Sequence, residues 1–240
     1  MRRAAVIAAL LAWLAPGLAA QAETDLGFFE EGTVSGPEVR TFALPLNGGE
    51  WTVNCYVAWV AGSKQAVIID PGTSAPDVLE FIREKRLDVL AVLHTHGHYD
   101  HVGGASFLAE KLSVPFYLHP ADRTLAERTT GPRVPFTPYP ASGILVLGGL
   151  AVEVLPTPGH SPGSVCLRTG GTLFSGDTLF AGGIGRACGE RRSEQEANLR
   201  LEVENIRRLL LSLPPLTRVL PGHGSSTTIG AERAFNRFLK

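Results

Sequence analysis

The amino-acid sequence predicts an α/β fold in which two β-sheets are covered by helices. The chain has 240 residues, of which 44% are hydrophobic and only 19% are charged, so it can bury the core of one large domain. Its apolar segments are short and are separated by frequent glycine (27) and proline (17), as in strands joined by turns. A few longer amphipathic segments between them predict the helices.

A first set of strands is predicted over residues 53–59, 65–70 and 89–93. The second of them ends sharply at the Asp-Pro-Gly turn that begins with Asp70. Ser74 is predicted to cap a helix in which three apolar residues share one face, Val78, Phe81 and Ile82. The third strand is short and rich in Val and Leu, which indicates a buried strand that delivers its C-terminal end to the residues after it.

A second set of strands is predicted over residues 144–147, 151–155, 164–167 and 172–174. A long amphipathic helix is predicted over residues 194–211. We find no repeat, low-complexity linker or second composition regime after the N-terminal segment, so these elements are expected to form one domain.

The N-terminal segment has the layout of a secretory signal peptide. Two arginines precede an apolar run over residues 4–15, which is followed by Pro-Gly and by small residues that allow cleavage after Ala20 or Ala22. The alternative is an uncleaved membrane anchor, but a spanning helix needs about 20 apolar residues and this run is shorter. We therefore expect a signal peptide over 1–22, a mature domain over 23–240 without a stable membrane anchor, and export to the periplasm or the medium.

Charge and cysteine content exclude several classes of protein. The 22 basic and 23 acidic residues leave a formal net charge of −1, which gives no reason to expect nucleic acid or an anionic membrane as a partner. The three cysteines, Cys55, Cys166 and Cys188, do not form an even-numbered disulfide framework and have no zinc-knuckle spacing. Cys55 and Cys166 are expected to be core residues of strands.

The sequence of residues 94–101, His-Thr-His-Gly-His-Tyr-Asp-His, holds four of the seven histidines and one carboxylate. In extended backbone, positions i and i+2 point the same way, so His96 and His98 can present two imidazoles to one metal ion. Asp100 and His101 follow where the chain is expected to turn into a helix after two glycines, so their side chains can face a different point. One short loop can thus serve two neighbouring metal ions.

Three further candidate ligands, His160, Asp177 and His223, lie in loops that follow predicted strands, and each comes directly after a glycine. Glycine lets the backbone turn tightly and brings the next side chain into a crowded site. Neutral imidazole and carboxylate together suit zinc, with iron or manganese possible. The other two histidines are expected to have different roles: His94 packs beside the site or supports it, and His119 is an ordinary loop residue.

These motifs resemble those of the metallo-β-lactamase superfamily, specifically its short, single-domain hydroxyacylglutathione hydrolase (glyoxalase II-like) branch. The resemblance rests on the H-x-H-x-D-H run and on the later PGH, GD and PGHG loops in that order, and it extends over most of the mature chain. It implies an αββα sandwich, with two mixed β-sheets packed together and helices on both outer faces. Cys188 departs from the pattern, because the family often has an acidic residue there.

The resemblance also implies a ligand set for two Zn²⁺ ions. His96, His98 and His160 would bind the first ion, Asp100, His101 and His223 the second, and Asp177 would bridge them. Asp100 and Asp177 are thereby the candidate catalytic carboxylates, and no organic cofactor is implied. Two such ions depress the pKa of a shared water, which supplies a hydroxide nucleophile at neutral pH without any serine or cysteine.

The favoured substrate is a small-molecule thioester or other ester. A thiolate leaves without being protonated, because a thiol pKa is about 8.5, whereas an alkoxide or amide nitrogen usually needs a proton donor. No dedicated general acid is evident, although Tyr99 or Asp100 could donate in a lactonase-like reaction. Asp70 is either a turn former or a carboxylate that orients a ligand histidine.

Several alternatives remain open at this point. A lactonase, a phosphodiesterase, a β-lactamase-like hydrolase and a mononuclear iron persulfide dioxygenase share the implied fold, and a metal-binding protein without turnover is the non-enzymatic alternative. Asp177 argues against a zinc β-lactamase, because related lactamases place cysteine or no ligand there. The sequence does not predict the oligomeric state.

Overall fold

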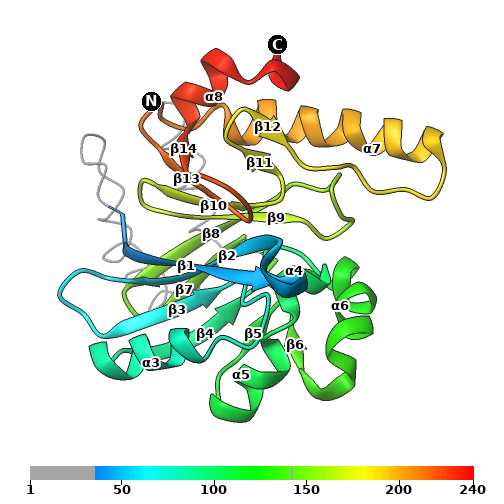
Figure 1. The fold of residues 1–240 in the computed structure, drawn as a ribbon. Coiled ribbons are helices and arrows are strands. Elements are labelled where there is room, and N and C mark those ends of the chain that lie inside the picture. Colours follow the sequence, from blue (N-terminus) through cyan, green and yellow to red (C-terminus); the bar gives the residue numbers. More distant parts are fainter. Residues whose placement is uncertain (1–35, 142) are drawn as a thin grey trace. The chain divides into compact units, whose positions relative to one another are not determined.

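Two six-stranded mixed β-sheets lie face to face with helices on both outer sides, and this αββα arrangement confirms the predicted fold class (Figure 1). The computed structural model describes residues 36–141 and 143–240, and residues 36–240 form one compact unit. The predicted signal peptide, the start of the predicted domain at residue 23 and the cleavage positions lie outside the described residues, so they stay predictions.

The first sheet has the order β1 to β6. Its N-terminal half is antiparallel and its remaining strands, from β3 onward, are parallel. The strands are β1 (Glu38–Leu46), β2 (Trp51–Trp59), β3 (Gln65–Ile69), β4 (Asp88–Leu93), β5 (Phe116–Tyr117) and β6 (Phe136–Thr137).

The second sheet has the order β14-β13-β10-β9-β8-β7, in which β10 and β13 are parallel and the other pairs antiparallel. Its strands are β7 (Ile144–Leu147), β8 (Leu150–Pro156), β9 (Val165–Thr169), β10 (Thr172–Gly176), β13 (Arg218–Pro221) and β14 (Thr227–Thr228). A small hairpin of β11 (Leu179–Phe180) and β12 (Gly183–Ile184) lies beyond β10.

The helices on the first sheet are α3 (Pro76–Lys85), α4 (Tyr99–Val102), α5 (Ala105–Lys111) and α6 (Arg123–Thr130). The second sheet is covered by α7 (Arg192–Asn205) with a π-helical turn (Ile206–Leu210), and by α8 (Ile229–Phe235). Short 3₁₀ turns cover Asn47–Gly49, Pro120–Asp122, Gly131–Arg133 and Arg237–Leu239.

Strand β2 shows how both faces of a sheet are buried. Cys55 and Val57 point into the core between the first sheet and its helices, whereas Tyr56 and Ala58 point into the core between the two sheets. Cys166 likewise lies in the core under α7, so the prediction that Cys55 and Cys166 are buried core residues is confirmed. Alternating side chains in a strand produce this division.

One local expectation was wrong. Ser74 does not cap α3, because the residue before Pro76 is Ala75 and no side chain accepts a hydrogen bond there. The helix begins at proline, whose fixed φ suits the first helical turn without a cap. The helix expected after the two glycines is confirmed as α5, and the structure adds a short helix before them, α4, on which Asp100 and His101 lie.

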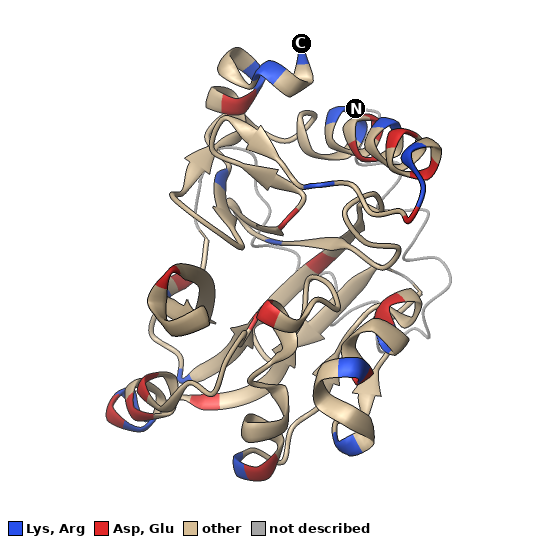
Figure 2. Cartoon of the chain, turned by 45° about the vertical axis from the view of Figure 1, so that its right-hand side comes forward, with Lys and Arg blue, Asp and Glu red and all other residues tan. Residues whose placement is uncertain are grey.

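Charged residues occur mainly on the outer helices, where blue and red segments are interspersed along the ribbon (Figure 2). Among the described helices, none has the length and apolar character needed to cross a membrane.

Candidate metal centre

The direction of the strands brings the seven candidate residues to one edge of the sandwich. In the first sheet, β3 and β4 are parallel neighbours, so Asp70 and the loop that leads into α4 leave at the same edge. In the second sheet, β8 and β10 are both antiparallel to β9, and β13 is parallel to β10. The loops with His160, Asp177 and His223 therefore also leave in one direction.

His96, His98 and His160 form a cluster that we call the three-histidine group. The Nδ1 atom of His98 lies 2.8 Å from Nε2 of His160, which in turn lies 3.3 Å from Nε2 of His96. Three imidazole nitrogens thus converge on one point. Nitrogens this close together, with no carboxylate among them, fit a single metal ion.

Asp100, His101 and His223 form a second cluster, which we call the carboxylate group. The Oδ2 atom of Asp100 lies 3.2 Å from Nε2 of His223 and 4.0 Å from Nε2 of His101. This cluster therefore offers two imidazole nitrogens and one carboxylate oxygen to a second metal ion.

Asp177 lies between the two groups. Its Oδ1 atom is 3.2 Å from Nε2 of His101, and its Oδ2 atom is 3.6 Å from Nε2 of His160 and 3.5 Å from Nε2 of His223. One carboxylate thus faces nitrogens of both groups. A carboxylate in this position could bind a metal ion on either side.

The outer nitrogens of four histidines are hydrogen-bonded away from the centre. The Nδ1–H groups of His160 and His223 donate to the backbone carbonyls of Arg186 (2.9 Å) and Thr52 (2.6 Å). Nδ1–H of His101 donates to Asp70, and Nδ1–H of His96 donates to the hydroxyl of the neighbouring Thr95. Each of these tautomers leaves the Nε2 lone pair free to bind a metal ion.

Asp70 has both of the roles considered for it. It adopts a left-handed backbone conformation with φ 51°, so it forms the turn after β3. Its Oδ2 atom accepts from Nδ1 of His101 at 3.0 Å and from the Thr95 hydroxyl at 2.7 Å, and its Oδ1 atom accepts from the Thr95 backbone N–H at 2.8 Å. Asp70 therefore orients His101 directly and His96 through Thr95.

Asp122 is a supporting residue that the sequence analysis missed. Its fully buried carboxylate accepts hydrogen bonds from the backbone N–H of Gly97 (2.8 Å), the Ser161 hydroxyl (2.6 Å) and the backbone N–H of Gly163 (2.7 Å). It thereby joins the loop of His96 and His98 to the loop of His160. The signal that could have revealed it is its place after β5, the parallel neighbour of β4, at the same edge of the sheet.

Two buried atoms at the centre have no hydrogen-bond partner in the described structure, Nε2 of His101 and Oδ1 of Asp177. The two atoms lie 3.2 Å apart without hydrogen-bond geometry, and a metal ion bound by both would offset the cost of burying them. The backbone also approaches closely, because a Cβ atom at Gly222 would lie 2.2 Å from Oδ1 of Asp177. The residues present therefore fit metal ions, and glycine before His223 is required by space.

Burial and neighbouring charges determine the protonation states of His96, His98 and Asp177. Burial, and after it the neighbouring imidazoles, lowers the pKa of His96 and His98, which keeps them neutral as metal ligands must be. Burial opposes ionisation of Asp177 as well, but His101, His160 and His223 hold its pKa well below the ordinary value. The carboxyl that lies between the two groups is thus an anion.

The remaining candidates lie around this centre. His94 is fully buried between Phe116 and Phe136, with Nδ1 3.2 Å from the backbone oxygen of His101, so the prediction that it packs beside the site is confirmed. His119 starts a 3₁₀ turn, as expected of a loop residue. Cys188 is partly exposed and accepts a hydrogen bond from Asn198 at 3.2 Å.

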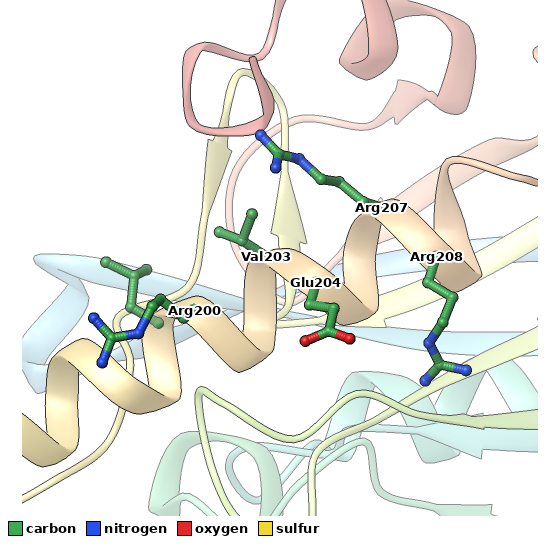
Figure 3. A pocket seen from close by; sticks show the side chains of 6 residues that line it. Arg200, Val203, Glu204, Arg207 and Arg208 are labelled. Atoms are coloured by element: carbon green, nitrogen blue, oxygen red, sulfur yellow. The ribbon is translucent and has the colours of Figure 1, made fainter.

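A pocket of about 400 Å³ opens beside the carboxylate group and contains Asp100 and His223 in its wall, together with Leu46, Asn47, Trp51, Tyr99 and Phe180. Another hollow, of about 650 Å³, lies along α7 (Figure 3). It is lined by side chains of α7 and of the π-helical turn that follows it, and the labelled arginines point away from one another. Of these two pockets, the first reaches the candidate ligands.

Comparison with known proteins agrees with this geometry. Residues 48–223 match the family model of the metallo-β-lactamase superfamily. Hydroxyacylglutathione hydrolase GloC of Haemophilus influenzae is 36% identical over 201 residues, which are 78% of this chain and 92% of that protein.

Two solved structures are also similar. TTHA1623 in a di-iron-bound form has 39% sequence identity and a TM-score of 0.64, covering 82% of this chain and 100% of that one. The B3 metallo-β-lactamase BLEG-1 has 33% identity and a TM-score of 0.70, covering 85% and 100%.

The family match and the two clusters of ligand-type side chains together indicate a metal-dependent hydrolase. The matched segment contains all seven candidate ligands and covers more than half of the chain. On these grounds the chain belongs to the metallo-β-lactamase superfamily.

Proposed function

We propose that this protein hydrolyses a thioester with two metal ions, one held by the three-histidine group and one by the carboxylate group, with Asp177 as the bridging ligand. The observation that carries the proposal is the position of Asp177, whose two oxygens face imidazole nitrogens of both groups within 3.6 Å. Zinc suits the donors, and iron or manganese is also compatible with them. When bound, the pair of ions would lower the pKa of water and polarise the substrate carbonyl.

The protein's own residues supply orientation. The backbone carbonyls of Arg186 and Thr52 and the carboxylate of Asp70 hold the ligand imidazoles in one tautomer, so the centre is arranged before substrate arrives. Asp100 extends from the carboxylate group into the wall of the pocket, where it also faces the substrate. Its carboxyl has a lowered pKa despite burial, because His223 and His101 stabilise the anion.

The leaving group follows from the protonation states in the pocket. An alkoxide or amine needs a proton at bond cleavage, and Asp100 is ionised and so holds no proton to give. A thiolate needs none, because its conjugate acid has a pKa of about 8.5. A thioester is therefore the substrate class that this pocket suits best, and the name of the GloC relative makes a hydroxyacylglutathione the first compound to test.

A second candidate is β-lactam hydrolysis, which the similarity to BLEG-1 favours. Asp177 argues against it, because related lactamases have cysteine or no ligand at the corresponding position. We place the reaction outside the cytoplasm, on the basis of the predicted signal peptide, and expect a small-molecule partner.

Metal analysis combined with a substrate panel tests the proposal. Purified protein would be analysed for zinc, iron and manganese and assayed with thioesters, a lactone, a phosphodiester, a β-lactam and a glutathione persulfide under oxygen electrode recording. We expect two metal ions per chain and the highest kcat/KM with a thioester. A single iron with oxygen consumption, bound metal without turnover, or a preference for the β-lactam would overturn it.

A further inference from the structure

The pocket beside the carboxylate group has an apolar rim made by three aromatic side chains from separate parts of the chain. Trp51 begins β2, Tyr99 begins α4 and Phe180 ends β11. Trp51 is 67% exposed and Tyr99 is 54% exposed. Single exposed aromatics are ordinary, but a group of them around a pocket indicates a surface that an apolar ligand covers.

Trp51 is fixed relative to the candidate ligands by the backbone next to it. The carbonyl of Thr52 accepts the hydrogen bond from Nδ1–H of His223, and the backbone N–H of Asn54 donates to the carbonyl of Gly222 at 2.7 Å. The first residues of β2 are therefore tied to the His223 loop. The backbone that carries Trp51 is thus held at a set position relative to His223.

The pocket wall offers no lysine or arginine to an anionic substrate, since neither occurs among the described residues that line it. A glutathione moiety has two carboxylates, and away from the metal ions they would lose hydration in this pocket without a Lys or Arg side chain to pair with. An uncharged apolar moiety meets no such penalty and removes aromatic surface from water.

We infer that this pocket binds an uncharged apolar group next to the scissile carbonyl, and that Trp51 is a specificity-determining residue for it. This inference rests on the proposed thioester hydrolysis and narrows it to thioesters of apolar acids or apolar thiols. An apolar acyl group and an apolar thiol would present the same chemistry to the pocket. The experiment therefore varies the two ends of the substrate separately.

In the first arm, the acyl group increases from acetyl to butyryl, octanoyl and phenylacetyl on the neutral thiol N-acetylcysteamine. In the second arm, the acyl group is constant and the thiol changes from N-acetylcysteamine to benzyl mercaptan and to glutathione. We expect kcat/KM to rise about tenfold or more with apolar size in one arm, and to be lowest with glutathione.

Variants distinguish a specific contribution of Trp51 to substrate preference from a general loss of activity. Trp51→Ala is expected to lose about tenfold on the best apolar substrate and less than twofold on the acetyl thioester, and Trp51→Phe is expected to restore most of the difference. Phe235→Ala is the matched control, because Phe235 is 80% exposed on α8 and does not line the pocket. The inference would be overturned if kcat/KM did not change with apolar size in either arm, or if Trp51→Ala lowered kcat/KM equally on every substrate.

Failure of the proposed function is recognised separately. If no thioester is hydrolysed by protein that holds two metal ions, that proposal fails, and binding still tests the pocket. The protein would then be titrated with the S-octyl thioether of N-acetylcysteamine and with the S-octyl thioether of glutathione, and its tryptophan fluorescence would be recorded. A signal change with the neutral thioether that Trp51→Phe abolishes supports the inference, and equal or tighter binding of the glutathione compound contradicts it.

Discussion

The three-histidine group and the carboxylate group face the same space, but they differ in the chemistry of their ligands and in what supports them. The first has imidazoles only, and Asp122 joins the loops that carry them. The second contains Asp100, and Asp70 contacts one of its imidazoles directly. A buried carboxylate thus supports each group, in one case through the loops and in the other through a ligand.

This difference indicates how the two ions would share the work. Three neutral imidazoles would leave most of the charge of a metal ion uncompensated, so that ion would polarise an oxygen ligand strongly. The carboxylate group would compensate more charge, and since Asp100 and His223 line the pocket, we expect a substrate to approach from its side. Asp177 faces nitrogens of both groups, so its substitution is expected to lower kcat/KM more than any other substitution considered below.

Asp177→Asn is expected to lower kcat/KM by about 10³-fold or more and to reduce the metal content below two ions per chain, because a neutral amide cannot bridge two cations. Metal analysis and steady-state kinetics on the same preparation measure both effects. Glu196→Gln, an exposed carboxylate on α7, is the control and is expected to stay within twofold of wild type. Retention of two ions and of activity within tenfold would show that Asp177 does not bridge.

Removing one imidazole from each group tests whether the groups act separately. His98→Ala and His223→Ala are each expected to lower kcat/KM about 100-fold and to leave one ion, held by the other group. Cobalt(II) substitution would distinguish the two remaining sites, since their absorption spectra differ with the number of imidazole and carboxylate ligands. Identical spectra for the two variants would mean that the same ion is lost in both, contrary to two separate groups.

Substitutions of the two supporting carboxylates, Asp70 and Asp122, are expected to have different effects on metal affinity and on stability. Asp70→Asn should weaken metal binding about 10- to 100-fold in a chelator titration with a small change in stability, because it weakens the orientation of a ligand. Asp122→Asn should lower the free energy of unfolding by about 2–3 kcal/mol in denaturant titrations, because its amide would face three hydrogen-bond donors. Equal effects of both variants on metal affinity and stability would remove this distinction.

The sequence predicted the fold class and the candidate ligands better than it predicted their support. Glycine and histidine spacing is local, so the run from His96 to His101 and the three later loops were recognisable. Asp122 was not, because its partners Gly97 and Gly163 are distant in the sequence and its own neighbours look like an ordinary loop. Contacts of this kind depend on strand order, which short-range patterns do not specify.

The same limit applied to Trp51 and Glu202. Nothing in the alternating pattern of residues 53–59 indicates that the residue at the start of β2 borders a pocket with the α4 segment. Glu202 occupies a buried position on a helix whose other charged residues are mostly exposed. A side chain that breaks the polarity pattern of its helix is visible only once the buried face is known.

Glu202 is the basis of the last prediction, a change in how stability depends on pH. The residue lies behind the three-histidine group, since a Cβ atom at Gly185 would contact both Oε1 of Glu202 and Nδ1 of His160. Its carboxyl is fully buried and both oxygens lack a hydrogen-bond partner among the described residues. Burial, with a smaller contribution from Asp177, raises its pKa from the ordinary value near 4.5 to about 8.

Between these two pKa values the folded protein keeps a proton that the unfolded chain has released, so the contribution of Glu202 to stability falls as pH rises. Glu202→Gln does not titrate, and we expect it to exceed wild type by on the order of 3 kcal/mol at pH 9 and to match it within about 1 kcal/mol near pH 4.5. Denaturant unfolding at both pH values, on metal-free and zinc-loaded protein, measures the difference. Glu204→Gln, an exposed neighbour on α7, should follow wild type at both pH values. If the free energy of unfolding of Glu202→Gln changes with pH as that of wild type does, the Glu202 carboxyl is ionised in the folded protein. The three-histidine group then has a charged carboxylate behind it, as the carboxylate group has in Asp70.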